Sequence, residues 1–497
     1  MAARRMSREA ARAPAASRIA FWAQIGFAAF IGLALLGHAG SAINFAFTPL
    51  ALLAAVFLFV WAPANYLGFC MWLWMLTPLV RRLVDWETVY HVISPVMLAP
   101  LLASSLSLWT LFRIAPRLMS RAYAPFCMIL CVCVYGLLVG VLQAGPAAAA
   151  YAFLNCVAPV CVGVHILARP REAEESGNAL FAALAWGALV IGSYGVWQYF
   201  SPQPWDVYWM LATEFTSAGL PLPHQIRVFS TMNSPGPFAV TMMAGLVVLL
   251  GEGRRVRWLA AAPGFAAFML SLVRAAWGGW VVAMGIIIFT ARMKRRMAYL
   301  AIIGALAAVA FPLLTVGPIA EAVQARLNTA TEIEADSSYR ERVDFYGSFA
   351  ATAFGTPLGV GLGTTGIASR LRSSDYALGD YGYFDSGIMD VFFTFGWLGA
   401  VVLLAAVSIA AEGLMATRRN GVAPIGAAIA IAAIAQMIFI DTLVGSSGML
   451  VFPFAAVSIA QSKWAESSAS ALASRRSSAT RRKFAAAPKP ALRRSIP

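Results

Sequence analysis

Apolar stretches of about 20 residues recur along the whole chain, and this feature limits the fold more than any other. Each stretch is long enough to cross the hydrocarbon core of a bilayer as a helix. Their recurrence predicts an all-α polytopic integral membrane protein with about fourteen transmembrane helices, or twelve to fourteen. The expected spans are 19–37, 45–62, 64–80, 92–112, 122–143, 147–168, 178–200, 235–251, 257–273, 275–291, 297–316, 386–411, 422–440 and 443–461.

The composition agrees with this class and argues against an ordinary soluble domain. Charged residues make up only 12% of the 497 residues, whereas soluble domains contain roughly 25%. Much of the net charge of +15 lies in the N-terminal arm and in the tail after Gln461. Basic flanks of this kind orient a membrane protein and contact anionic lipid, so the charge does not indicate a nucleic-acid partner.

The basic loops predict the orientation of the chain. An even number of spans places the basic segments near 113–121, 254–257, 292–296 and 418–419 on the cytoplasmic side, together with both termini. We therefore expect a cytoplasmic arm at 1–18, a multi-pass membrane domain at 19–461 and a disordered basic tail at 462–497. The loop expected to contain Arg81 and Arg82 falls on the opposite side, against this rule.

The same topology places two long loops on the extracytoplasmic side, at about 201–234 and 317–385. The second is the largest polar region, and it is helix-compatible from about Ser337 before a turn-rich Gly/Pro segment. We expect function in these loops, because polar chain is where a membrane protein holds polar substrates.

Arg274 is the only charged residue between Trp258 and Ala291. A single helix over this stretch would be about 50 Å long, too long for a hydrocarbon core of about 30 Å. Two short spans meeting around 271–275 fit better, and they place Arg274 at the extracytoplasmic turn of a hairpin. The alternative role is an interfacial or helix-capping arginine.

Three further arginines belong to the same side: Arg227, Arg340 and Arg342. Guanidinium groups bind phosphate in bidentate fashion, so several of them on one face favour an anion such as a diphosphate. The alternative for Arg227 is an exposed loop residue without a specific role. The alternative for Arg340 and Arg342 is a solvated helix face with an internal Arg340–Asp344 pair.

Four short motifs follow one another along the chain: Arg227 with the Asn233-Ser234-Pro235 turn, Ser271 with Arg274, Arg342 with Tyr346, Pro357 and Gly359-Val360-Gly361, and Asp385-Ser386 ahead of Phe395-Gly396-Trp397-Leu398-Gly399. With these motifs in this order, the chain resembles the O-antigen ligase and polymerase superfamily of bacterial envelope glycosyltransferases over roughly 225–400. Ligases of this superfamily usually carry a histidine where this chain has Asp385. The departure favours a polymerase.

The resemblance implies a metal-independent glycosyltransferase of the bacterial inner membrane, without a cofactor, whose active site faces the periplasm. Its donor would be a glycan on undecaprenyl diphosphate. It implies catalytic roles for Arg274, Arg342 and Asp385, and substrate binding by Arg227, Arg340, Tyr346 and Asp380. Asp385 would accept the acceptor's proton or position the sugar, and its alternative role is a helix N-cap. Chain-length, flippase and export proteins would be its protein partners.

Several alternatives stay open beside a polymerase: a ligase acting on another acceptor, a lipid-linked oligosaccharide flippase, and a non-catalytic scaffold. A flippase should carry charge along many spans, whereas most spans here are free of it.

The run Gly361-Leu362-Gly363-Thr364-Thr365-Gly366 matches a dinucleotide-binding pattern but lacks the surrounding βαβ unit. We therefore expect a turn there. Cys131 and Cys133 have no nearby metal-ligating partner, and we expect no metal site.

Overall fold

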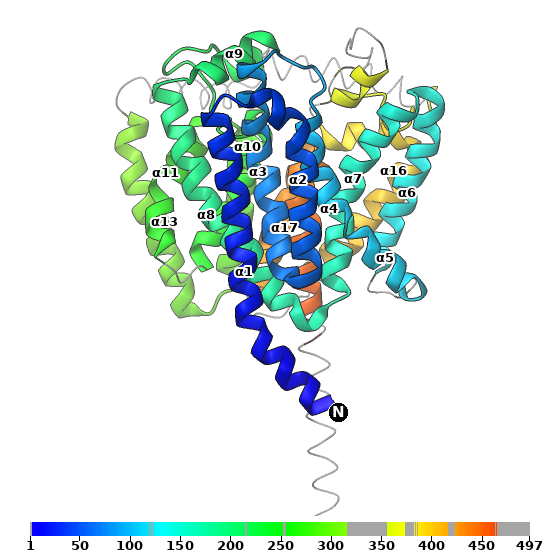
Figure 1. Cartoon of the computed structure of the whole chain (residues 1–497). Helices are drawn as coiled ribbons and strands as arrows, with labels where there is room; N and C mark the ends of the chain where they lie inside the picture. Colours follow the sequence, from blue (N-terminus) through cyan, green and yellow to red (C-terminus); the bar gives the residue numbers. More distant parts are fainter. Residues whose placement is uncertain are drawn as a thin grey trace, which may run out of the picture.

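The computed structural model describes residues 2–118, 120, 123–213, 216–251, 255–315, 355–372, 382, 384, 386–415, 423–462 and 464. In these ranges the regular structure is helical, apart from one isolated antiparallel bridge between Gly219 and Ile226. The helices stand side by side in one bundle (Figure 1). The prediction of an all-α protein is confirmed for the described part of the chain.

Eight helical segments among the described residues are long and apolar enough to cross a membrane. They are the part of α1 (Ala2–Leu36) from Arg18 onward, α2 (Gly40–Trp61), α3 (Pro63–Glu87), the segment Pro95–Ile114 built from η1 (Pro95–Met97), α4 (Leu98–Ser105) and α5 (Leu108–Ile114), α6 (Ala124–Gln143), α7 (Pro146–Leu167), α8 (Ala173–Phe200, with the turn from Pro170), and α16 (Gly387–Met415). The polytopic membrane class follows from these helices.

Shorter helices complete the bundle. They are α10 (Pro235–Gly251), α11 (Val256–Leu270), α12 (Arg274–Thr290), α13 (Met293–Thr315), α17 (Ala423–Ala435) with η7 (Gln436–Ile438), and a helix over 445–462. Helical structure thus covers each of the fourteen predicted spans, and the bounds differ by a few residues. The predicted tail at 462–497 and much of the predicted loop at 317–385 lie outside the described residues.

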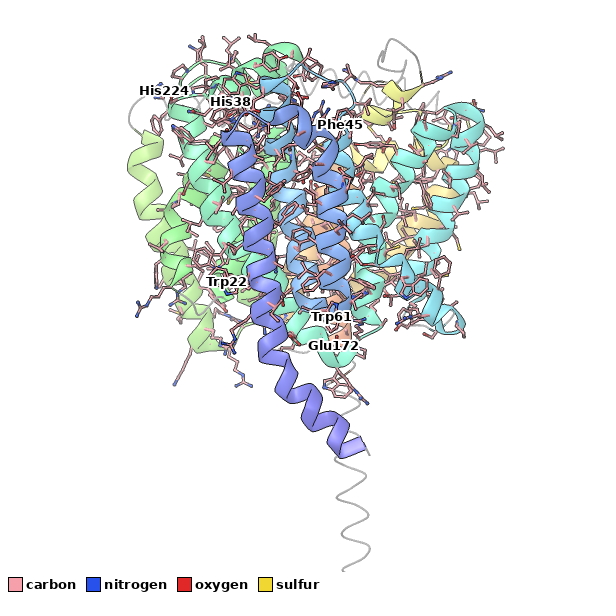
Figure 2. All side chains as sticks on the ribbon, in the orientation of Figure 1. Trp22, His38, Phe45, Trp61, Glu172 and His224 are labelled. Carbon is pink, nitrogen blue, oxygen red and sulfur yellow. The ribbon has the colours of Figure 1, made fainter. Side chains whose placement is uncertain are left out.

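The two ends of the bundle differ. One end, here called the loop end, bears α9 (Pro204–Ala212), His38 and His224 (Figures 1 and 2). The other, here called the arm end, bears Trp61 and Glu172, and the first turns of α1 extend beyond the bundle on this side. The predicted loop at 201–234 therefore lies opposite the N-terminal arm, as the basic residues of the sequence indicated.

The expectation that Arg81 and Arg82 lie in a loop is wrong. Helix α3 continues to Glu87, and both side chains are buried. Arg81 Nε lies 3.3 Å from Asp85 Oδ2, and Arg81 Nη2 donates to the carbonyl of His91 at 2.6 Å. Since these guanidinium groups are partnered inside the bundle, the loop-charge rule does not apply to them.

The glycine-rich run at 359–363 enters the bundle between α6, α7 and α16. Its backbone N–H groups donate to helix carbonyls: Val360 to Phe393 at 3.0 Å, and Leu362 to Gly136 at 2.9 Å. Gly361 has φ +80°, and a Cβ there would lie 2.2 Å from the nitrogen of Gly140. The run follows no strand, so a dinucleotide-binding βαβ unit is absent from the described part of the chain.

The same run interrupts α16. Gly396 has φ 66° inside this helix, and the N–H of Trp397 next to it donates to the carbonyl of Pro357 at 3.0 Å. Extended backbone is stable at membrane depth only where it is enclosed by protein. The run satisfies this condition, because the helices on either side supply its hydrogen-bond partners.

Candidate active site at the loop end

A tight turn joins α11 to α12. Helix α11 ends at Leu270, and α12 begins at Arg274. Leu272 adopts φ 54°, a left-handed conformation that residues with a side chain rarely take. The buried hydroxyl of Ser271 donates to the carbonyl of Phe268 at 2.6 Å. The predicted pair of short helices meeting near 271–275 is confirmed.

Arg227 links the loop at about 201–234, here called the first loop, to this turn through hydrogen bonds. Its Nε and Nη2 donate to the carbonyl oxygens of Ser271 and Leu272 at 3.4 and 3.3 Å, and its Nη1 donates to that of Ser217 at 2.9 Å. The backbone N–H of Val228 donates to the carbonyl of Leu270 at 3.1 Å. In this arrangement Arg227 positions the hairpin, while its contact with substrate stays a prediction.

Arg274 is partly buried as the first residue of α12, at the loop end. The other predicted site residues lie outside the described residues: Arg340, Arg342, Tyr346, Asp380 and Asp385. Their meeting with Arg274 stays a prediction. Ser386, which follows Asp385, is buried at the start of α16, and its carbonyl accepts the first helical hydrogen bond from Asp390 at 3.0 Å.

A cavity of about 260 Å³, here called the polar cavity, lies beside this region. Arg81 from α3 and Asp441 from the segment after η7 contribute its charged groups. The remaining wall combines amides, hydroxyls, aromatic rings and small or apolar residues: Trp74, Val92, Ile93, Ser94, Met97, Leu101, Tyr151, Asn155, Asn233, Pro237, Ile367, Val444, Gly445, Ser446 and Ser447.

The first loop connects Arg227 to the polar cavity. Five residues separate Arg227 from Asn233, which lines the wall together with Pro237 near the start of α10. Between them, the Ser230 N–H donates to Gln198 Oε1 at 2.8 Å, and the Thr231 hydroxyl donates to the carbonyl of Met75 at 2.7 Å. The loop is therefore attached to both α8 and α3.

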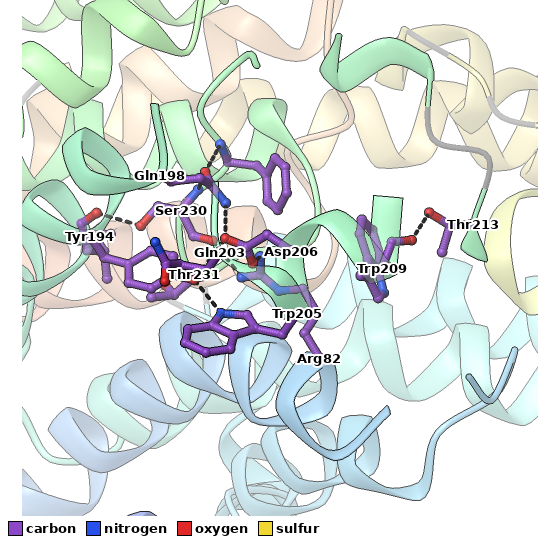
Figure 3. A network of polar contacts seen from close by, with 12 residues as sticks. Arg82, Tyr194, Gln198, Gln203, Trp205, Asp206, Trp209, Thr213, Ser230 and Thr231 are labelled. Carbon is purple, nitrogen blue, oxygen red and sulfur yellow. Dashed lines mark hydrogen bonds and ion pairs between the residues drawn. The ribbon is translucent and has the colours of Figure 1, made fainter. Parts of the chain in front are cut away.

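A buried ion pair reinforces these attachments (Figure 3). Arg82 from α3 pairs with Asp206 from α9 and also donates to the carbonyl of Ser230 at 2.5 Å. Asp206 accepts further hydrogen bonds from Tyr194 and Gln198, both at 2.8 Å. Burial raises the pKa of Asp206, and the Arg82 guanidinium opposes that rise. The network holds α9 and the loop as one unit.

Asp441 is a titratable group of the cavity whose pKa is shifted. Burial, and to a smaller extent the charge of Asp390, raise the pKa of Asp441 to about 7, while the N–H of Leu443 donates to its Oδ1 at 3.2 Å and opposes this shift. Asp390 lies one turn into α16, where it accepts hydrogen bonds from Thr365 and Thr394, both at 3.2 Å. A carboxyl group with a pKa near 7 exchanges protons readily at neutral pH.

Sequence reasoning missed Arg81 and Asp441 as site residues. An isolated charge among apolar residues, the signal that singled out Arg274, could have identified Asp441. It is the only acidic residue between Glu412 and Glu466, and it separates two apolar stretches. Both residues also come from parts of the chain far from the motifs that carried the family resemblance.

A larger cavity, of about 480 Å³, lies at the other end of α12. Arg292, Lys294 and Arg295 line it, beside Tyr299 and Pro424. The 17 residues of α12 separate it from Arg274 by about 25 Å. The larger cavity therefore takes no part in the candidate site, and its basic wall suits anionic lipid.

Comparison with protein families identifies one domain of the chain. Residues 240–404 match the family model described as O-antigen ligase (Wzy_C). The chain carries an O-antigen ligase family domain. This is a bacterial membrane family of polysaccharide ligase and polymerase enzymes. No curated protein matches the chain.

The O-antigen ligase domain contains the Arg274 hairpin, the glycine-rich run and the break in α16 at Gly396. Arg227 lies just before it, and the two charged residues of the polar cavity, Arg81 and Asp441, lie outside it on either side. Of the described residues that line the cavity, only Ile367 lies within the matched range, so the cavity is built mainly by the chain on either side of the family domain.

Proposed function

We propose that the protein polymerises lipid-linked oligosaccharide repeats into exopolysaccharide or O-antigen by glycosyl transfer from undecaprenyl diphosphate. The observation that carries this proposal is the turn between α11 and α12, within the O-antigen ligase domain. This turn presents Arg274 at the loop end, and Arg227 binds its carbonyls.

The proposed reaction needs positive charge at the leaving group. A hydroxyl oxygen of the acceptor attacks the anomeric carbon of the donor, the bond from that carbon to the diphosphate oxygen breaks, and the electron pair stays on the diphosphate. Arg274 and Arg342 stabilise the developing charge. Arg340 and Tyr346 hold the donor, while Asp385 or Asp380 contacts the sugar or accepts the hydroxyl proton.

The proposed orientation places the loop end in the periplasm and both termini in the cytoplasm of a bacterial inner membrane. The basic residues around the start of α13 support it, because Arg292, Lys294 and Arg295 lie at the arm end. Fourteen spans bring both termini to the same side. Chain-length, flippase and export proteins are the proposed partners.

Lipid-linked glycans in a gene-deletion strain test this function. Accumulation of single lipid-linked repeats is the result expected for a polymerase, because each repeat then remains unextended. Finished polymer left on its lipid carrier would indicate a ligase, the second candidate, which the family description favours. Repeats retained on the cytoplasmic face would indicate a flippase and contradict both.

Site variants test the assigned residues. Arg274→Ala and Arg342→Ala should each abolish polymer, although the protein still inserts into the membrane. Polymer at the wild-type level in both variants would contradict the assignment. Because arginines are proposed to stabilise the diphosphate, turnover should also survive a chelator.

A further inference from the structure

The wall of the polar cavity contains polar groups that lack protein partners. Asn233 Oδ1 and Ser94 Oγ are buried and form no hydrogen bond within the described part of the chain. A buried polar atom without a partner costs about 1–3 kcal/mol. A ligand rich in hydroxyl groups would supply the missing partners, since a hydroxyl both donates and accepts.

The charge of the cavity argues against the diphosphate as its occupant. The guanidinium of Arg81 is used by the protein, because it pairs with Asp85 and donates to the carbonyls of His91 and Val92. Asp441 is left as the acidic group of the wall. A neutral polyol suits this balance better than a dianion, which the carboxylate would repel.

The size of the cavity points to a single sugar ring. Pockets for drug-sized ligands measure roughly 300–1,000 Å³, and the volume of about 260 Å³ lies just below this range. The wall also includes Trp74, whose ring is held by a hydrogen bond from its Nε1 to Ser104 at 3.0 Å. Aromatic surface with a few fixed polar groups is typical of small-molecule sites.

The cavity also adjoins the start of α16, the helix that follows the predicted site residue Asp385 in the sequence. A Cβ on Gly387 would lie 2.9 Å from the Cα of Asp441, so the two backbones are in contact. Cys156 on α7 and Asp390 on α16 interact electrostatically with Asp441, and Arg81 on α3 lies on the same cavity wall.

We propose that the polar cavity binds a sugar ring of the acceptor glycan and that Asp441 accepts the proton of its attacking hydroxyl. This inference rests on the proposed function. The O–H bond breaks as its proton passes to the Asp441 carboxylate, the oxygen bonds to the anomeric carbon, and the diphosphate leaves with the electron pair. Asp441 thereby takes the role considered above for Asp385.

The test uses the full-length protein in lipid nanodiscs, with lipid-linked repeats extracted from the deletion strain as substrate. Turnover is measured from pH 5.5 to 9, and binding of sugar-free undecaprenyl diphosphate is measured separately. In the wild type, turnover should rise through about pH 7 as Asp441 loses its proton. Asp441→Asn should lower turnover by about 100-fold or more and remove this rise.

Binding of undecaprenyl diphosphate should be the same in wild type and Asp441→Asn, and Asp441→Glu should recover part of the turnover. Wild-type turnover with an unchanged pH profile in Asp441→Asn would overturn the proposal. Asp385 would then again be the proposed acceptor of the hydroxyl proton. A wild-type protein that neither binds undecaprenyl diphosphate nor extends the glycan would instead refute the proposed function.

A second variant covers the case in which Asp441→Asn does not fold. Asn233→Ala should raise the KM for the acceptor about 10-fold, with kcat little changed, because it removes a hydrogen bond to the sugar. Asn44→Ala is the matched control, since Asn44 Oδ1 is also buried without a partner in the described structure but does not line the cavity. Equal KM values in the two variants would overturn the proposed sugar site.

Discussion

Arg227 donates a hydrogen bond from Nη2 to the carbonyl oxygen of Leu272, at 3.3 Å. One loop thereby holds the strained turn that precedes Arg274. The contact joins a residue outside the O-antigen ligase domain to the hairpin inside it. The geometry of the hairpin thus depends on a side chain that need not contact the substrate.

Arg227→Lys should lower kcat/KM about 10- to 100-fold, because a lysine cannot reach three carbonyl oxygens with separate directed donors. Polymer formation in membrane vesicles provides the measurement, with protein levels checked in parallel. Turnover equal to that of the wild type would show that charge alone suffices at this position.

Arg274→Lys should lose about 100-fold or more in turnover, because an ammonium group cannot bind two phosphate oxygens in a planar fork. Arg292→Lys is the control, as it preserves charge at the arm end, far from the turn. If Arg274→Lys is as active as this control, Arg274 is an interfacial anchor and no phosphate ligand.

Asp206→Ala should lower the free energy of unfolding by about 3–5 kcal/mol, because it leaves the buried Arg82 guanidinium without its ion-pair partner. Thermal and denaturant unfolding in detergent would measure the loss. Glu172→Ala removes a surface pair with Arg169 and should change stability by less than about 1 kcal/mol. Similar losses in both variants would contradict the structural role of the buried pair.

The double variant Arg82→Met with Asp206→Leu separates the ion pair from the packing. Replacing both charges by apolar groups of similar size is often close to neutral. The double variant should therefore recover most of the stability lost in Asp206→Ala, and a loss as large as in the single variant would point to the hydrogen bonds of Gln198 and Ser230 instead.

Gly361→Ala should cost about 2 kcal/mol or more, because the left-handed backbone disfavours a Cβ and the added atom would meet the backbone of Gly140. Gly285→Ala on α12 is the control, since a Cβ there meets nothing within 4 Å. The yield of monodisperse protein after extraction would separate the two. A fully stable Gly361→Ala variant would show that α6 shifts to accept the side chain.

The spans and the Arg274 hairpin could be predicted because their signals are local. Length and hydropathy place a helix within a few residues, and 34 residues cannot cross a bilayer once, so Arg274 had to lie near a turn. Arg81 and Arg82 behaved differently. Their partners include Asp206, which is distant in sequence, so the local pattern suggested a loop where the fold has a helix.

The polar cavity could not be predicted for the same reason, because it depends on contacts between residues that are distant in sequence. Arg81 lies near the start of the chain and Asp441 near its end, and only packing brings them to one wall. The glycine pattern at 361–366 identified a tight backbone, but the sequence did not reveal that its partners are Gly136 on α6 and Phe393 on α16.

The position of Arg274 in its helix has an electrostatic consequence. The aligned peptide dipoles of a helix leave about half a positive charge at its N-terminus, which favours anions and disfavours cations. Arg274 is the first residue of α12, so its guanidinium adds to that charge. An anion bound at the turn offsets both contributions together. The substrate's phosphates would then stabilise the folded hairpin itself, and melting temperature would report their binding independently of catalysis.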